Sequence, residues 1–90
     1  MLITDKNTLK KFGTNHRFWQ GIPGLEKTKG GRLFACFYSG NHCEDRDNCC
    51  LLVKSDDDGK TWSEPIAAAY RSKLFRCYDP CLWIDPLGRL

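Results

Sequence analysis

The loop of residues 40–48 gathers carboxylates that could act as a proton donor. Its sequence, Gly-Asn-His-Cys-Glu-Asp-Arg-Asp-Asn, contains Glu44, Asp45 and Asp47. Neighbouring carboxylates raise one another's pKa, and a general acid needs a carboxyl group that keeps its proton near neutral pH. We rank Asp47 first and Glu44 second as this acid, because Asp47 lies nearest the strand expected to follow. The alternative is a hydrophilic surface loop without a catalytic role.

Cysteines and aspartates raise the question of a metal site. Four side chains could be drawn as zinc ligands: His42, Cys43, Cys49 and Cys50. The paired C-x-x-C spacing typical of structural zinc sites is absent from the sequence. A calcium loop around the Asp-rich stretch fails at both ends, where Lys54 and Pro65 would have to be ligands. We therefore expect free thiols that pack as small apolar groups, with no metal and no other cofactor.

The composition indicates one small globular unit. The chain has 90 residues, 41% of them hydrophobic, and a formal net charge of +3. No apolar stretch approaches the ~20 residues of a membrane helix, and no recognition motif for nucleic acid accompanies the lysines of the first third. The N-terminal stretch lacks the pattern of a secretory signal. We expect no membrane or nucleic-acid partner, and a cytoplasmic protein or the mature form of an exported one.

Short runs of β-branched and aromatic residues alternate with Gly, Pro, Asn and Asp clusters from Arg17 onward. This rhythm is typical of antiparallel β-structure. We expect strands at residues 18–25, 32–38, 49–55, 61–69 and 78–85. The first contains Gly21 and Pro23, which a paired strand tolerates only where it bends. Residues 88–90 repeat the Gly-Arg-Leu of residues 31–33, so the last strand is expected to begin a second copy of the unit.

A turn motif separates the third and fourth expected strands. Residues 55–62 match the pattern S-x-D-x-G-x-T-W at every defining position: Ser55, Asp57, Gly59, Thr61 and Trp62. Asp57 can accept hydrogen bonds from turn amides, and Gly59 permits a positive φ. Ser55 can add a local hydrogen bond, and Trp62 can pack the turn against an apolar layer. The motif predicts a compact structural corner rather than a catalytic site.

The motif and three further stretches, at residues 20–25, 31–38 and 79–90, resemble the start of a sialidase-family propeller with Asp-box repeats. The resemblance covers about residues 17–90. It implies an all-β fold, in which antiparallel four-stranded blades form a six-bladed ring. We therefore expect a partly mobile lead-in at residues 1–16, a first blade at residues 17–75, and the start of a second blade at residues 76–90.

The resemblance also implies a sugar site. In that family arginines bind the carboxylate of a sialic acid, because the guanidinium fork forms paired hydrogen bonds. The family's first arginine is missing here, since Gly21 stands where it is expected, and Arg17 is the candidate substitute. Four residues are thus expected to contact substrate: Arg17, Gln20, Arg76 and Asp79. A solvated charge for Arg17, and a local ion pair for Arg76 with Asp79, are the structural alternatives.

The family assigns its acid/base carboxylate to the loop after the second strand, which contains Asp47 and Glu44 here. Its tyrosine nucleophile and assisting glutamate would belong to later blades. We therefore expect part of an exo-glycosidase acting on terminal sialic acid or a related sugar, without activity as this isolated piece. The alternative is a non-catalytic propeller that binds a glycan or a protein. Unpaired blade edges also predict self-association.

Overall fold

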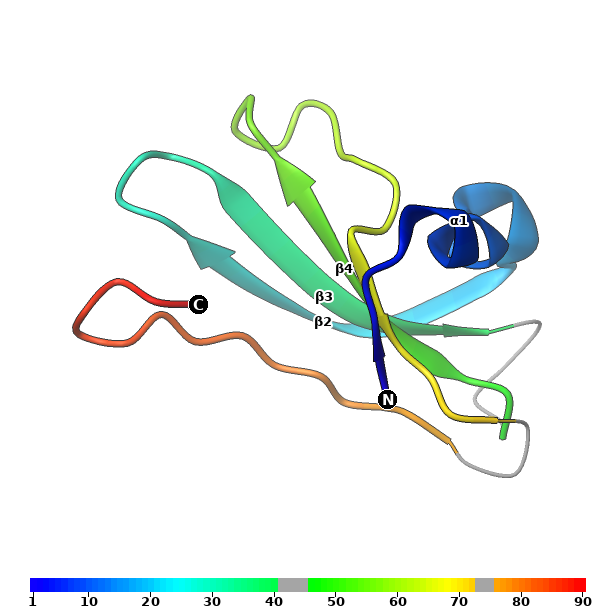
Figure 1. The fold of residues 1–90 in the computed structure, drawn as a ribbon. Helices are drawn as coiled ribbons and strands as arrows, with labels where there is room; N and C mark the ends of the chain where they lie inside the picture. Colours follow the sequence, from blue (N-terminus) through cyan, green and yellow to red (C-terminus); the bar gives the residue numbers. More distant parts are fainter. Residues whose placement is uncertain (41–45, 73–75) are drawn as a thin grey trace.

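The computed structural model describes residues 1–40, 46–72 and 76–90. Its centre is one antiparallel sheet with the order β1-β5-β4-β3-β2. The strands are β1 (Leu2–Ile3), β2 (Trp19–Lys27), β3 (Leu33–Gly40), β4 (Cys49–Ser55) and β5 (Ala67–Ala69). Figure 1 shows β2, β3 and β4 as the long strands of the sheet. The chain is therefore mostly β, as expected.

The central strand β4 follows the period of two that a sheet imposes on its side chains. Cys49, Leu51, Val53 and Ser55 are buried, and the residues between them are half-buried. In the register with β3, Phe37 pairs with Leu51. Both faces of β4 are therefore shielded from solvent, and the face of Cys49 and Leu51 carries the main core. The expected bounds of this strand, residues 49–55, are confirmed.

The edge strand β2 bends, as its glycine and proline predicted. The register with β3 shifts between Gly21 and Gly24, and Ile22 inside this bulge has a φ of 46°. A positive φ is costly for a β-branched residue, because its side chain crowds the backbone. Pro23 lacks an N–H group, and a bulge on an edge strand is a position that tolerates this loss. The bulge lets β2 continue beyond both residues to Lys27.

Residues 1–16, the expected lead-in, form one short strand and several helical turns. β1 pairs with β5, and α1 (Lys6–Leu9) follows, with two short 3₁₀ turns at Lys10–Phe12 and Thr14–His16. Asp5 caps α1 by accepting a hydrogen bond from the Thr8 N–H group at 2.8 Å. The sequence predicts no element here because the segment is polar and short. Its few apolar side chains nevertheless reach the core.

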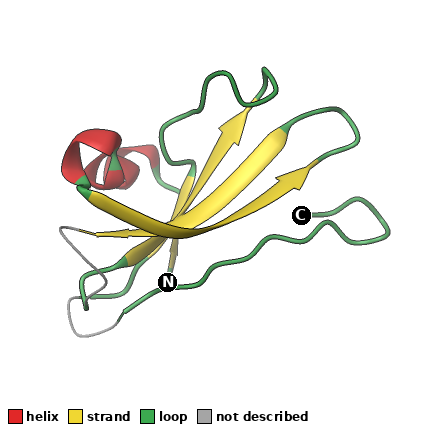
Figure 2. Ribbon diagram, turned by 180° about the vertical axis from the view of Figure 1, so that it is seen from behind, coloured by secondary structure: helices red, strands yellow, loops and turns green. Residues whose placement is uncertain are grey.

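The core lies between the helical turns and one face of the sheet (Figure 2). A cluster of buried side chains joins α1, β4 and β5: Leu9, Cys49, Leu51 and Ala68. Half-buried apolar side chains from β1, β3 and the flanking turns complete it: Ile3, Phe12, Phe37 and Tyr70. Burial of apolar area is the main force that holds this layer on the sheet. The N-terminal segment is thus part of the folded unit.

Two expected strands differ from the structure. The fourth, at residues 61–69, is shortened to β5, because residues 61–66 form an irregular connection. The fifth, at residues 78–85, is wrong: among the described residues 76–90 there is no strand. The segment instead runs extended beside β2, without a ladder partner, towards the C-terminus (Figure 1). A strand needs a hydrogen-bonded neighbour, and apolar composition alone does not provide one.

The part of the chain that the structure describes contains no helix with the length and apolarity needed to cross a membrane.

Candidate functional site

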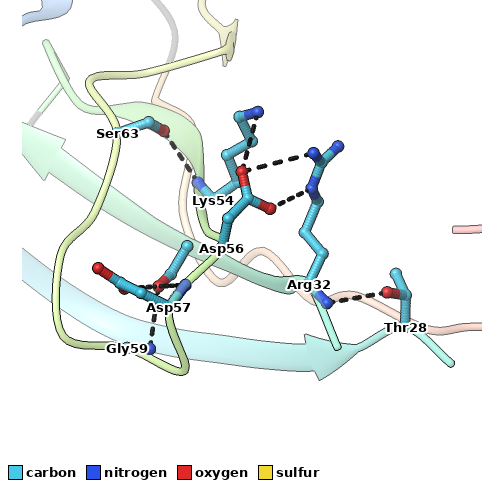
Figure 3. Close-up of polar contacts among 8 residues, drawn as sticks. Thr28, Arg32, Lys54, Asp56, Asp57, Gly59 and Ser63 are labelled. Atoms are coloured by element: carbon cyan, nitrogen blue, oxygen red, sulfur yellow. Dashed lines mark hydrogen bonds and ion pairs between the residues drawn. The ribbon is translucent and has the colours of Figure 1, made fainter. Parts of the chain in front are cut away.

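The 55–62 turn is closed by its own side chains. The Ser55 hydroxyl donates to Asp57 Oδ1 at 2.8 Å and accepts the Gly59 N–H at 2.9 Å. Asp57 Oδ1 also accepts the Thr61 N–H at 2.8 Å, and Asp57 Oδ2 accepts the Thr61 hydroxyl. Figure 3 shows the carboxylate of Asp57 inside this loop. Ser55 and Asp57 therefore close the turn through hydrogen bonds with residues 59 and 61.

The backbone of the turn needs the residues that the motif places there. Gly59 has a φ of +87°, in the region that favours glycine, and Asp58 before it has a φ of 61°. Trp62 lies over Gly59, with its Cζ2 atom 3.8 Å from the position that a Gly59 Cβ would occupy. Trp62 keeps 43% of its surface exposed. It therefore covers the turn rather than entering the main core.

Hydrogen bonding also controls the charge of the turn. The bonds from Thr61 and from Ser55 lower the pKa of Asp57 to about 2. Next to it, Asp56 pairs with Arg32 at 2.5 Å and with Lys54 at 3.4 Å (Figure 3). The bond from Arg32 is the main cause of the lowered pKa of Asp56. The turn therefore keeps its carboxylates ionised, and they serve the local structure.

Arg17 lies between the helical turns and the sheet. Its guanidinium stacks over the Phe37 ring at 5.3 Å, and its Nη2 group donates to Thr14 Oγ1 at 3.2 Å. The Nε atom is buried, without a hydrogen-bond partner among the described residues. Burial lowers the pKa of Arg17, although the group stays cationic at neutral pH. Arg17 therefore presents a partly desolvated cation with an unused donor.

Glu64 fixes the segment that carries Arg17. Its carboxylate accepts the Thr14 N–H at 2.9 Å and the Thr14 hydroxyl at 2.7 Å. These bonds, led by the side-chain bond from Thr14, lower the pKa of Glu64. Ser63, next to Glu64, pairs with Lys54: its N–H donates to the Lys54 carbonyl at 2.9 Å. The 55–62 turn is thus connected to Arg17 through Glu64 and Thr14.

Asp47 and Arg17 line the same cleft, which has a volume of about 280 Å³. The Tyr70 hydroxyl donates to Asp47 Oδ1 at 3.0 Å and also lines the cleft. Desolvation first, and then this bond to a carboxylate, raise the pKa of Tyr70. Lys11 and His16 complete its polar lining. The first-ranked carboxylate and the candidate arginine therefore lie at one site.

Gln20 lines a second cleft, to which Arg17 also contributes. This cleft has a volume of about 480 Å³, within the size range of small-molecule pockets, and Gly21 and Pro23 of the β2 bulge form part of its wall. Gly21 leaves little room for a larger residue, because an added Cβ would lie 3.0 Å from the Trp19 ring. Arg17 thus contributes to two neighbouring clefts, one with Asp47 and one with Gln20.

Arg76 and Asp79 line neither of these clefts. The Arg76 guanidinium stacks over the neighbouring Tyr78 ring at 4.7 Å. Asp79 has a φ of 50°, at a bend of the C-terminal segment, and contributes to the electrostatic environment of Cys50. The second carboxylate candidate, Glu44, and its neighbour Asp45 lie outside the described residues. The structure therefore brings together Arg17, Gln20 and Asp47 from the expected set.

Two residues of this site had no predicted role. Glu64 follows the turn motif directly in the sequence, but no spacing rule pairs it with Thr14. Tyr70 ends an apolar run, which indicates burial and not a bond to Asp47. Their partners lie 50 and 23 residues away in the chain. Long-range pairs of this kind depend on how the layers dock.

The zinc alternative rests partly on His42 and Cys43, which lie outside the described residues. Within the described ranges, no group of three or more His, Cys, Asp or Glu side chains is arranged to hold a metal ion. Five cysteines there are free thiols: Cys36, Cys49, Cys50, Cys77 and Cys81. Burial raises the pKa of Cys49 to about 11, so this thiol stays protonated at neutral pH.

Comparisons with known proteins found no relative. No protein-family model matches the sequence, no curated protein matches it, and no solved structure matches the fold.

Proposed function

We propose that this chain supplies part of the acidic-sugar site of a sialidase-like propeller. The activity proposed for the whole protein is hydrolysis of terminal sialic acid, or of a related sugar, from glycoconjugates. The observation that carries the proposal is the position of Arg17, which lines one cleft with Asp47 and another with Gln20. A cationic fork beside a carboxylate and an amide has the chemistry needed to bind a carboxylated, hydroxylated ligand.

The burial of Arg17 supports its role as the carboxylate binder. A guanidinium shielded from water forms stronger electrostatic interactions than a solvated one. Its Nε atom has no partner among the described residues, and the Thr14 hydroxyl holds its Nη2 group. The Nε donor is therefore unsatisfied, and a ligand oxygen would pair with it once the side chains that cover it move aside. Arg17 takes this role in place of the missing arginine at Gly21, whose surroundings are too tight for a long side chain.

Asp47 is the proposed acid/base carboxylate. The Tyr70 hydroxyl holds it at 3.0 Å, and β4 begins two residues later. A general acid has to be positioned within hydrogen-bond reach of the leaving oxygen, and this tether limits where the carboxyl group can move. Hydrolysis also needs the nucleophile that the resemblance assigns to later blades. We therefore expect ligand binding but no turnover from the 90-residue chain.

A non-catalytic propeller that binds a glycan or a protein is the second candidate. The 55–62 turn supports it equally, because its side-chain bonds close the turn and leave no reactive group free. The two candidates differ at Asp47: an enzyme needs its carboxyl group, whereas a binding module needs only the arginine and the shape of the cleft.

Chemical-shift perturbation of the ¹⁵N-labelled chain by N-acetylneuraminic acid tests the proposal. We expect saturable shifts at Thr14, Arg17 and Gln20, with weak affinity in the millimolar range, about 4 kcal/mol of binding free energy. The methyl ester of the same sugar keeps the ring and its hydroxyl groups but lacks the charge. It should bind at least tenfold more weakly, because the paired bonds to the guanidinium lose their charge.

Arg17→Ala should abolish the shifts, and Arg17→Lys should not restore them, since an ammonium group lacks the planar fork. Arg32→Ala is the matched control, because Arg32 is an arginine paired with Asp56 in the remote turn. Equal shifts with the acid and its ester, or undiminished binding by Arg17→Ala, would contradict the proposal. A fluorogenic sialoside separates the candidates once the whole protein is used: Asp47→Asn should remove turnover and leave binding intact.

A further inference from the structure

The C-terminal segment, which runs beside β2, brings Cys81 close to Cys36 at Gly24 of that strand. A Cβ added at Gly24 would lie 2.9 Å from the Cys36 sulfur, 3.5 Å from the Cys81 Cα atom and 3.6 Å from the Pro80 carbonyl oxygen. The Cys36 sulfur and the Cys81 backbone therefore border the same small space. No side chain separates them there, because residue 24 is a glycine.

The two thiols differ in access to water. Cys36 keeps 4% of its surface exposed, whereas Cys81 is an exposed residue. The charge of Cys81 is one of the influences on the Cys36 thiol, and burial is the main one that raises the pKa of Cys36. The pair thus combines an accessible thiol with a sheltered one. Such an arrangement favours oxidation at the accessible sulfur first.

We propose that Cys36 and Cys81 form a disulfide that attaches the C-terminal segment to β3. The attachment has a structural reason, because residues 76–90 have no strand partner in the described chain. One hydrogen bond joins this segment to the chain next to β4, from the Cys77 N–H to the Asn48 carbonyl at 3.2 Å. A second tie at Cys81 would hold the segment over Gly24. It would also shield the face of the sheet that carries Cys36.

Hydrogen peroxide, or another peroxide, supplies the oxidising equivalents. The Cys81 thiolate attacks one peroxide oxygen, the O–O bond breaks, and Cys81 becomes a sulfenic acid while one water leaves. The Cys36 sulfur then attacks the Cys81 sulfur and displaces a second water. The S–S bond forms as the S–O bond breaks, and the Cys36 proton leaves with the water. Two thiols lose two electrons and two protons, and one peroxide is reduced to two waters.

Cys50 and Cys77 form the rival pair. Cys77 is close enough to contribute to the raised pKa of Cys50, which reaches about 12, mainly through burial. Cys77 is held, however, by its own backbone bond to the Asn48 carbonyl. Bridging requires Cα atoms within about 7 Å and side chains that point towards each other. At Gly24 the Cys36 sulfur and the Cys81 Cα atom lie 2.9 Å and 3.5 Å from the position of an added Cβ, so the two residues are neighbours there.

Peptide mapping after mild oxidation tests the proposal. The folded chain is treated with one equivalent of hydrogen peroxide, the remaining thiols are alkylated, and trypsin then cuts after Arg32, Arg46, Arg76 and Arg89. Peptides 33–46 and 77–89 each contain two cysteines. The Cys43→Ser/Cys77→Ser variant leaves one cysteine in each, so a linked pair identifies Cys36 with Cys81. We expect this pair as the main product, formed about tenfold faster than in urea-unfolded chain.

Cys81→Ser is the first control, since an exposed position tolerates it, and it should remove the linked pair and leave the fold unchanged. Gly24→Ala keeps both thiols but fills the space between them, so it should slow linkage severalfold. A link between peptides 47–54 and 77–89 in the natural sequence, oxidation without any internal link, or equal rates in folded and unfolded chain would each overturn the proposal. Sugar binding plays no part in this test, so its outcome is separate from that of the proposed function.

Discussion

Thr14 donates two hydrogen bonds to Glu64 across 50 residues of sequence. The contact joins the connection after the 55–62 turn to the helical turns of the N-terminal segment. Thr14 also accepts a bond from Arg17 at 3.2 Å. The turn, which has no reactive group of its own, can therefore influence the candidate site by holding the segment that carries its arginine. In this fold the structural motif and the functional cation are physically connected.

Glu64→Gln tests that connection. The amide oxygen of glutamine can accept one bond, but its NH₂ group cannot accept the second from Thr14. We expect the Thr14 amide to exchange with deuterium about five- to tenfold faster, and the Arg17 side-chain resonances to shift. Glu26→Gln, a half-buried glutamate on β2, is the control. Unchanged exchange at Thr14 would show that Glu64 does not position the segment.

The lowered pKa of Asp57 predicts how the stability of the fold depends on pH. Folding lowers the pKa of this carboxyl group from 3.8 to about 2. A lowered pKa means that the carboxylate stabilises the fold above about pH 4, and that this contribution is lost as the pH falls towards 2. The urea midpoint should therefore fall over that range. Asp57→Asn should lower the midpoint at pH 7 and weaken its dependence on pH between 4 and 2.

The control for Asp57→Asn is the same substitution at the neighbouring residue, Asp58. Asp58→Asn removes the same charge but leaves the bonds among Ser55, Asp57 and Thr61 in place. Asp58 pairs only at the surface with Lys27, at 3.1 Å. Exposed pairs contribute little, so the Asp58→Asn midpoint at pH 7 should stay close to that of the natural chain. Equal effects of the two substitutions would mean that charge, and not the bonding inside the turn, sets the stability.

Ile22→Gly should stabilise the protein. Ile22 has a φ of 46° in the β2 bulge and keeps 53% of its surface exposed. Glycine relieves the crowding of a left-handed conformation, worth about 1 kcal/mol, and little apolar burial is lost. Leu25→Gly, an exposed position on the same strand, should instead destabilise by about 1 kcal/mol. Thermal unfolding followed by circular dichroism would show opposite shifts, and parallel shifts would argue against strain at Ile22.

Among the substitutions proposed for stability, Leu51→Ala should lower the free energy of unfolding most. Leu51 keeps 1% of its surface exposed and packs with Leu9 and Ala68. Truncating a core leucine costs about 2–5 kcal/mol, a large share of the stability of a small domain. Leu87→Ala, at a residue with 78% exposure, should change stability by no more than about 0.5 kcal/mol. Urea unfolding gives both values, and a small effect at Leu51 would place the core elsewhere.

The strongest agreement between prediction and structure comes from local patterns. The alternation of β4 and the bend of β2 at Gly21 and Pro23 follow from side-chain period and backbone freedom within a few residues. The 55–62 turn is the clearest case, because each bond in it joins residues no more than four positions apart. The propeller itself stays a proposal, since one antiparallel sheet fits several β architectures.

The features that the sequence did not predict share one physical cause. Residues 78–85 have strand composition, but a strand exists only where a neighbour completes its hydrogen bonds, and residues 76–90 have none within the described chain. Residues 1–16 look polar, yet Leu9 becomes a core residue because the sheet offers α1 an apolar face. Composition predicts how a segment can behave, and its neighbours in space decide whether it does so.

The sequence by itself determined the local geometry: where strands alternate, where the chain turns, and which side chains close the turn at Ser55 and Asp57. Only the tertiary structure decided that Arg17 lines a cleft with Asp47, that Glu64 holds Thr14, and that Cys81 lies near Cys36 at Gly24. Local features depend on steric limits and hydrogen bonds that act over a few residues. The pairings depend on how the layers pack, and this is settled by the burial of apolar area across the whole molecule.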